Sequence, residues 1–156
     1  MGAALNARDT EFKAATDALD ANSVDLSKAI GSVYGADAEK NFLALWRKHI
    51  GLLVDYTQGL VAKDKAKQDK AVNDLLAYSG DFGKFLETAT NKILSTDTVS
   101  ALVKTHVQTL KDIVDAQAAK DYPKTSSSFH TAFAHMPMIA DPLADAIVKQ
   151  FPDKFK

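Results

Sequence analysis

The stretch Ser23-Val-Asp-Leu-Ser-Lys-Ala-Ile30 decides the fold, because its pattern opens a unit that recurs along the chain. Ser79-Gly-Asp-Phe-Gly-Lys-Phe-Leu86 matches it position for position, and Asp141-Pro-Leu-Ala-Asp-Ala-Ile147 is a weaker third copy. In each copy an aspartate is followed by apolar residues at spacings of three and four, which is typical of an amphipathic helix. The sequence therefore predicts three helices of one kind.

A second motif recurs between these openings. Arg47-Lys-His-Ile50 matches Val103-Lys-Thr-His-Val107, so His49 and His106 take the same place in two successive units. Helices that carry the Ser23–Ile30 pattern and helices that carry His49 or His106 thus alternate along the chain. We predict a single domain over residues 1–156 with an internal repeat at approximately 23–78 and 79–150.

The periodicity predicts an all-α fold, since no segment shows the alternation of a strand. Connections such as Lys63-Asp64 and Lys120-Asp121 are short, and short connections make successive helices antiparallel. We expect an antiparallel helical bundle, four-helix-bundle-like with about five helices, built from duplicated helical hairpins. The expected helices cover residues 10–33, 37–62, 66 to about 91, a fourth capped by Thr96 or Asp97, and 123–151.

Two prolines interrupt the last of these helices. Pro137 and Pro142 each lack a backbone N–H and disturb a straight helix. We expect a kink or break between Met136 and Asp141, with Asp141 restarting the helix as its N-cap.

The alternation of helix types also predicts a gap. A histidine-type helix follows the first and third helices, and by the same spacing one should precede the first. The missing helix could belong to a longer parent protein, be supplied by another subunit or be dispensable, and its absence could leave an apolar groove between the first and last helices. Such a groove could be filled by another chain, giving a dimer or a longer assembly.

Composition narrows the classes of partner. The chain has 156 residues, a net charge of −1, 46% hydrophobic and 25% charged residues, and no cysteine. Charges of both signs are interspersed, which indicates no nucleic-acid partner. No apolar run is long enough to span a bilayer, so we expect no membrane insertion. The absence of cysteine excludes disulfides and thiolate metal sites.

Catalytic motifs are missing. There is no Gly-rich phosphate loop, no Gly-x-Ser-x-Gly elbow and no His-Glu-x-x-His. No Glu-x-x-His occurs either, which disfavours a di-iron site. The repeated Asp25, Asp81 and Asp141 are interpreted as structural, and the sequence predicts that the protein is not an enzyme.

His49 and His106 are the first candidates for a metal site, because each lies on the apolar stripe of its helix. A duplicated hairpin tends to place such residues about a pseudo-twofold axis, where they could bind one metal ion or two faces of a haem. The alternative is that both are core histidines with a hydrogen-bonded neighbour.

A second cluster adds soft ligands. His130, His135, Met136 and Met138 lie within nine residues, and histidine with methionine suits copper. His130 and His135 are five residues apart and point to different faces of a regular helix. The alternative interpretation places Met136 in the core, Met138 as a filler and the two histidines on the rim. The candidate metal ligands are therefore His49, His106, His130, His135, Met136 and Met138. Copper or haem is the cofactor that they could bind, and the favoured interpretation is that the protein binds no cofactor.

Four strings also carry a family resemblance. They are Ala18-Leu-Asp-Ala-Asn-Ser-Val-Asp-Leu-Ser-Lys-Ala-Ile-Gly-Ser-Val-Tyr-Gly35, Trp46-Arg-Lys-His-Ile50 through Val54-Asp-Tyr56, Ala134-His-Met-Pro-Met138 and Ile147-Val-Lys-Gln-Phe-Pro152. The chain resembles a secreted helical-bundle family of Bacillus-like Gram-positive bacteria, some of whose members are fused to a copper amine oxidase N-terminal-like domain. The resemblance implies an extracellular or cell-envelope location, a leader peptide on the parent protein and a further histidine-bearing helix before the first.

Two functions follow as hypotheses. The first is a non-enzymatic extracellular helical bundle module for binding, spacing or assembly, with a protein partner or self-association. The alternative is a transition-metal (copper-like) or haem-binding four-helix bundle that uses the repeat-related histidines.

Overall fold

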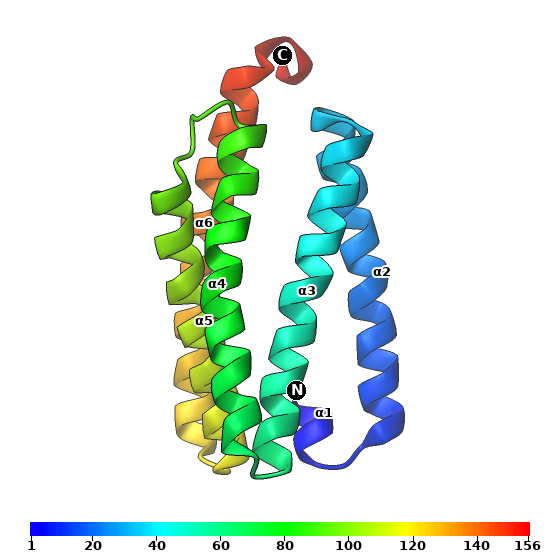
Figure 1. Ribbon diagram of the computed structural model, residues 1–156, viewed down its shortest axis with the longest axis vertical. Helices are drawn as coiled ribbons and strands as arrows, with labels where there is room; N and C mark the ends of the chain where they lie inside the picture. Colours follow the sequence, from blue (N-terminus) through cyan, green and yellow to red (C-terminus); the bar gives the residue numbers. More distant parts are fainter.

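Five long helices stand side by side in the computed structural model, which describes residues 1–156 (Figure 1). Each long helix runs antiparallel to the next, and the chain contains no strand. The predicted all-α antiparallel bundle is therefore confirmed. No helix combines the length and the apolarity that crossing a bilayer requires. The elements are α1 (Gly2–Leu5), α2 (Asp9–Tyr34), α3 (Ala36–Val61), α4 (Lys65–Ala89), α5 (Thr96–Ala118), α6 (Tyr122–Gln150) and the 3-10 turn η1 (Pro152–Phe155).

Two of the connecting turns share one backbone geometry. Lys63 and Lys120 take left-handed φ values of 55° and 58°, which reverses the chain in a single step. The next residues, Asp64 and Asp121, then cap α4 and α6. Each aspartate accepts a hydrogen bond from the backbone N–H three residues on, at 2.9 Å and 3.0 Å. The short polar sequence Lys-Asp therefore ends one helix and starts its antiparallel neighbour.

The start of α5 differs from the prediction by one residue. Ser95, and not Thr96 or Asp97, is the N-cap, and its hydroxyl accepts a hydrogen bond from the Thr98 backbone N–H at 3.2 Å. Thr96 instead bonds the Glu87 carboxylate through its backbone N–H at 2.6 Å. This contact ties the first turn of α5 to the end of α4.

The predicted break in the last helix is wrong, whereas the kink given as its alternative stays a prediction. α6 continues through both Pro137 and Pro142, and Asp141 lies inside it. Each proline leaves the carbonyl four residues earlier, on Phe133 and Met138, without its usual helical donor. Both of those residues are exposed, so water can hydrogen-bond the freed carbonyls. The helix therefore tolerates the two prolines on its solvent side.

The helices form an open ring. α2 packs on α3, α3 on α4, α4 on α5 and α5 on α6, but α2 and α6 do not pack along their length. Their C-terminal ends are linked by the Tyr34 hydroxyl, which donates to Gln150 Oε1 at 2.7 Å. Nearby, Lys154 Nζ donates to the Ser32 carbonyl at 3.2 Å. We call the line along which α2 and α6 face each other the seam.

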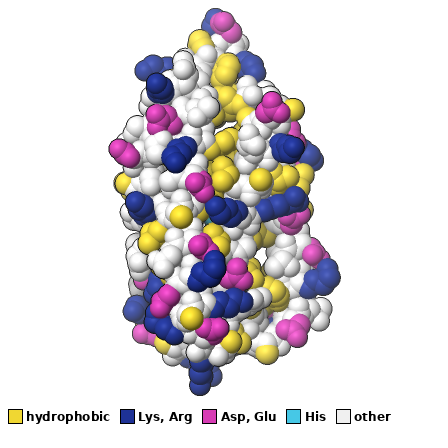
Figure 2. Space-filling view, viewed as in Figure 1, with side chains coloured by type: hydrophobic (Ala, Val, Ile, Leu, Met, Phe, Trp, Pro, Cys, Tyr) yellow, Lys and Arg dark blue, Asp and Glu magenta, His cyan; other side chains and the backbone are white.

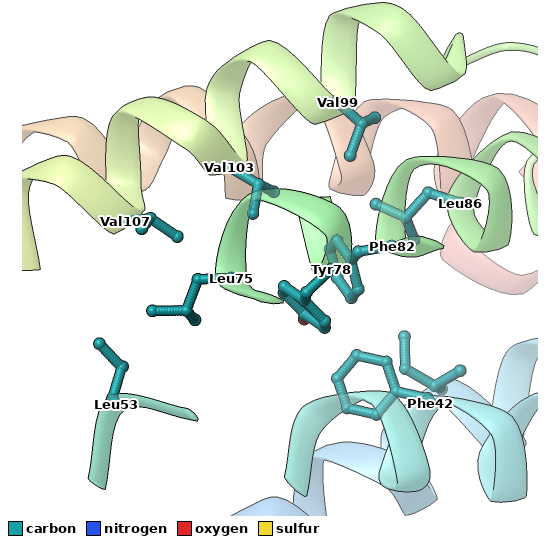
Figure 3. Packing of buried hydrophobic residues seen from close by; sticks show 10 residues of the cluster. Phe42, Leu53, Leu75, Tyr78, Phe82, Leu86, Val99, Val103 and Val107 are labelled. Carbon is teal, nitrogen blue, oxygen red and sulfur yellow. The ribbon is translucent and has the colours of Figure 1, made fainter. Parts of the chain in front are cut away.

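The main core lies between α3, α4 and α5. Figure 3 shows Phe42 and Leu53 of α3 pointing toward side chains of α4, with valines of α5 on the other side of those side chains. A smaller cluster around Tyr56, Ala71 and Val114 closes the other end of the bundle, and Leu5 of α1 packs on it. Figure 2 shows the face formed by α3 and α4, where apolar side chains are visible along a narrow furrow between charged residues of both signs.

Candidate functional site

A central cavity of about 320 Å³ lies inside the ring of helices. All five long helices contribute to it, and 17 of its 19 lining residues are hydrophobic. The remaining two are His49 and His106. No Lys, Arg, Asp or Glu side chain lines it. The two histidines of the sequence repeat therefore face one apolar cavity from different helices.

The cavity opens at the seam. Four of its lining residues are exposed, and all four come from the two helices that do not pack on each other: Leu26 and Ala29 of α2, and Met136 and Ala140 of α6. The lining residues of α3, α4 and α5 are buried or half-buried. The groove expected between the first and last helices is thus the mouth of the cavity, and its filling by another chain stays a prediction.

His49 is held among aromatic rings. Its imidazole lies edge-on to Trp46, with ring centroids 4.6 Å apart, and stacks on Tyr78 at 5.4 Å. Its Nδ1 atom is buried without a hydrogen-bond partner. Burial lowers the pKa of His49 to about 4, and the nearby His106 lowers it further, while the Trp46 backbone, close to the ring but outside hydrogen-bonding geometry, opposes part of the shift. The ring is therefore uncharged at neutral pH.

His106 has a similar environment on α5. Its Nδ1 atom is also buried without a partner, and its ring stacks on His135 of α6 with centroids 6.4 Å apart. Burial lowers the pKa of His106, and the neighbouring His135 lowers it further. In both histidines Nδ1 is enclosed by protein, which leaves Nε2 as the ring nitrogen that a ligand in the cavity can reach.

The other proposed metal ligands are dispersed along α6. Met136 lines the cavity mouth, whereas His130 and Met138 are exposed and do not line the cavity. His135 is buried, and its Nε2 donates to the Leu102 carbonyl at 2.9 Å. The structure thus brings only His49, His106 and Met136 to one cavity.

No cluster of three or more His, Cys, Asp or Glu side chains is placed to hold a metal ion. Asp25, Asp81 and Asp141 are exposed, and Asp81 pairs with Lys48 at 2.9 Å, linking α4 to α3. The structural interpretation of these aspartates fits their positions on the surface.

Sequence reasoning missed the aromatic side of the cavity. Neither Trp46 nor any tyrosine was among the candidate site residues, but Trp46 and Tyr78 line the cavity and Tyr78 is only 3% exposed. Phe42 stacks on Trp46 at 5.1 Å, and Tyr78 stacks on Phe82 at 5.7 Å. We call Phe42, Trp46, Tyr78 and Phe82 the aromatic wall. The spacing of four residues between Phe42 and Trp46, repeated between Tyr78 and Phe82, was the available signal.

Comparisons with family models, with curated proteins and with solved structures find no match to this chain.

Proposed function

We propose that the bundle is a binding module that takes a small, uncharged, largely apolar molecule into its central cavity. The observation that carries the proposal is the cavity itself, with 17 hydrophobic residues and two neutral histidines around about 320 Å³. Native interiors are normally packed as closely as organic crystals, so a void of this size is unusual. A ligand that fills it gives the lining side chains the contacts that they otherwise lack.

Energetics also favour an occupied cavity. Because the cavity is apolar and opens at the seam, its lining meets water when no ligand is bound, and covering apolar surface stabilises a protein by about 25 cal/mol per Å². Whole domains are stable by only about 5–15 kcal/mol. Occupation of the cavity would therefore raise the stability of the bundle substantially.

The absence of charge in the lining limits the ligand. With no Lys or Arg around the cavity, a buried carboxylate or phosphate would lose its hydration without gaining an ion pair. Neither histidine hydrogen-bonds a carboxylate that would make it a general base, which supports binding rather than catalysis. The extracellular location implied by the family resemblance would give such a module access to molecules from the surroundings.

The test is a titration with N-phenyl-1-naphthylamine, an uncharged probe whose fluorescence rises in apolar surroundings. We expect saturable binding with one site per chain. Ala140→Leu, which places a larger side chain at the cavity mouth, should weaken binding by at least about tenfold. Ala144→Leu, one turn further along the same exposed helix face but outside the cavity, is the matched control. Absence of saturable binding, or equal binding by both variants, would contradict the proposal.

A second candidate is a copper or haem centre on the same cavity. The observation that favours it is that His49, His106 and Met136 share the cavity, since two imidazoles with a thioether suit copper, and two imidazoles suit haem iron. Against it, metal-bound histidines almost always donate their second N–H to an acceptor, and here both Nδ1 atoms lack one. Titration with copper(I) and with haemin distinguishes the two candidates, because only a metal site predicts stoichiometric binding that His106→Ala abolishes.

A further inference from the structure

We infer that the cavity selects flat aromatic molecules of two or three fused rings that carry a hydroxyl group at their edge. This inference rests on the proposed function, because it names the chemical class of the ligand for the same cavity. Three features of the cavity carry it: its two unlike walls, its size and its pair of histidines.

The side of the cavity formed by α3 and α4 carries a cluster of aromatic rings, which Leu53, Leu75 and Leu86 flank along the two helices. Phe42 and Trp46 of α3 are in ring contact with Phe82 of α4, at centroid distances of 6.3 Å and 6.1 Å. Tyr78 and His49 extend this set of touching rings. In Figure 3 the rings of Phe42, Tyr78 and Phe82 point toward one another from the two helices. Aromatic ligands gain favourable stacked or edge-to-face contacts with such a wall that saturated ligands do not.

The side formed by α5 and α6 is aliphatic. α5 and α6 contribute Val103, Val107, Leu110, Ile139 and Leu143, and His106 is the only ring on that side. A flat molecule can present one face to each wall, so both faces are removed from water. Bulky branched molecules cannot contact the two walls equally well.

The volume sets the number of rings. The cavity is about twice as large as the engineered cavity of roughly 150 Å³ that holds one benzene molecule. Two or three fused rings therefore fit in it, whereas a four-ring sterol or a porphyrin would have to extend into the seam.

The histidines account for the hydroxyl group. His49 of α3 lies on the aromatic side of the cavity and His106 of α5 lies on the aliphatic side, so a ligand can reach an imidazole on each side. With Nδ1 enclosed, each ring has Nε2 left for a ligand. A neutral imidazole either donates or accepts a hydrogen bond through Nε2, according to its tautomer. A hydroxyl group can pair with Nε2 in both tautomers, because it is both a donor and an acceptor.

The experiment compares three uncharged ligands of similar size by competition with N-phenyl-1-naphthylamine. The ligands are 2-naphthol, naphthalene, which lacks the hydroxyl, and trans-2-decalol, which keeps the hydroxyl but is saturated. We expect 2-naphthol to bind about tenfold more tightly than trans-2-decalol, through the ring contacts, and about fivefold more tightly than naphthalene, through one hydrogen bond.

The histidines are tested by the double variant that combines His49→Leu with His106→Leu. It should bind naphthalene at least as well as the wild type and should lose the preference for 2-naphthol over naphthalene. Retention of that preference in the double variant, or equal affinities of the wild type for 2-naphthol and trans-2-decalol, would overturn the inference and leave the proposed function standing. Failure of all three ligands and of the probe to bind would overturn both.

A measurement on the wild type tests the role of the histidines even if the double variant does not fold. The imidazole signals of the four histidines are followed by nuclear magnetic resonance while 2-naphthol is added. We expect His49 and His106 to shift, and the exposed His130 to serve as the unshifted control. If binding occurs without movement of either cavity histidine, the hydroxyl is not held by them and the inference fails.

Discussion

The rings of His106 and His135 stack across the contact between α5 and α6, with their planes only 16° apart, yet only His135 has a hydrogen-bond partner. His135 is satisfied by the Leu102 carbonyl, whereas the Nδ1 atom of His106 is buried and unpaired. The two adjacent histidines thus differ in role: His135 links α6 to α5 through its hydrogen bond, whereas His106 lines the cavity and keeps Nε2 for a ligand.

The bond between His135 and Leu102 predicts a stability effect. His135→Phe removes the donor and leaves the Leu102 carbonyl without that partner, so it should lower the free energy of unfolding by about 1–3 kcal/mol. Urea denaturation monitored by circular dichroism measures the change. His130→Phe, at an exposed position on the same helix, serves as the control and should change stability by less than about 0.5 kcal/mol. Equal effects of the two variants would show that the hydrogen bond does not contribute.

His49 predicts a pH dependence of stability. Its pKa is lowered to about 4 in the folded chain, whereas an unfolded histidine titrates near 6.5. Between these values the unfolded state binds more protons, so the contribution of His49 is complete above pH 6.5 and is lost as the pH falls toward 4. The total loss is on the order of 3 kcal/mol, since one pKa unit corresponds to about 1.4 kcal/mol. His49→Leu should flatten the curve of unfolding free energy between pH 6.5 and pH 4 relative to the wild type. If both proteins show the same slope in that window, His49 is not responsible for it.

Two glycines of α4 predict opposite effects of the same substitution. A Cβ atom at Gly83 would lie 2.6 Å from the Thr96 carbonyl oxygen, at the start of α5, and backbone cannot yield cheaply. A Cβ atom at Gly80 would meet nothing within 4 Å. Gly83→Ala should therefore lower the melting temperature, whereas Gly80→Ala should raise stability by up to about 1 kcal/mol through helix propensity. Stabilisation by both substitutions would show that α4 and α5 do not approach closely at Gly83.

Tyr56 predicts a polar contribution at the closed end of the bundle. Its hydroxyl donates to the Asp115 carboxylate at 2.6 Å, and Lys111 contacts the same carboxylate at 2.6 Å. Burial, and then this bond, raise the pKa of Tyr56 to about 12. Tyr56→Phe should lower the free energy of unfolding by about 1–2 kcal/mol, measured by urea denaturation. Tyr122→Phe, at an exposed tyrosine, is the control and should leave the free energy of unfolding unchanged.

Local features of the fold were predictable from the sequence because their causes are local. In the Lys63-Asp64 turn, Lys63 reverses the chain and Asp64 caps the next helix, so the causes lie within two residues. The predicted bounds of the first three long helices lie within two residues of those observed. The uninterrupted course of α6 was not predictable, since it depends on whether the carbonyls freed by Pro137 and Pro142 face solvent.

The candidate site was predictable only in part. The apolar stripes indicated that His49 and His106 point inward, and both line the cavity. A helical stripe, however, specifies which side chains face the interior and not how far apart the opposing helices stand. Phe42, Trp46 and Tyr78 would show the same spacing around a filled core. The repeat indicated the groove between α2 and α6, but the depth and the volume of the cavity behind it depend on how all five long helices pack, which no short stretch of sequence encodes.

The open ring of helices also has a consequence for how the chain folds. Because each helix packs on its successor, most contacts join residues that are near in sequence, and the entropy lost in closing the intervening loops is small. The bond between Tyr34 and Gln150, by contrast, joins residues 116 positions apart. Hairpins should thus form rapidly and early, and the link between the two ends should form last. On that order of events the cavity is completed only at the final step of folding, so partly folded chains would have no competent pocket in which to trap a ligand.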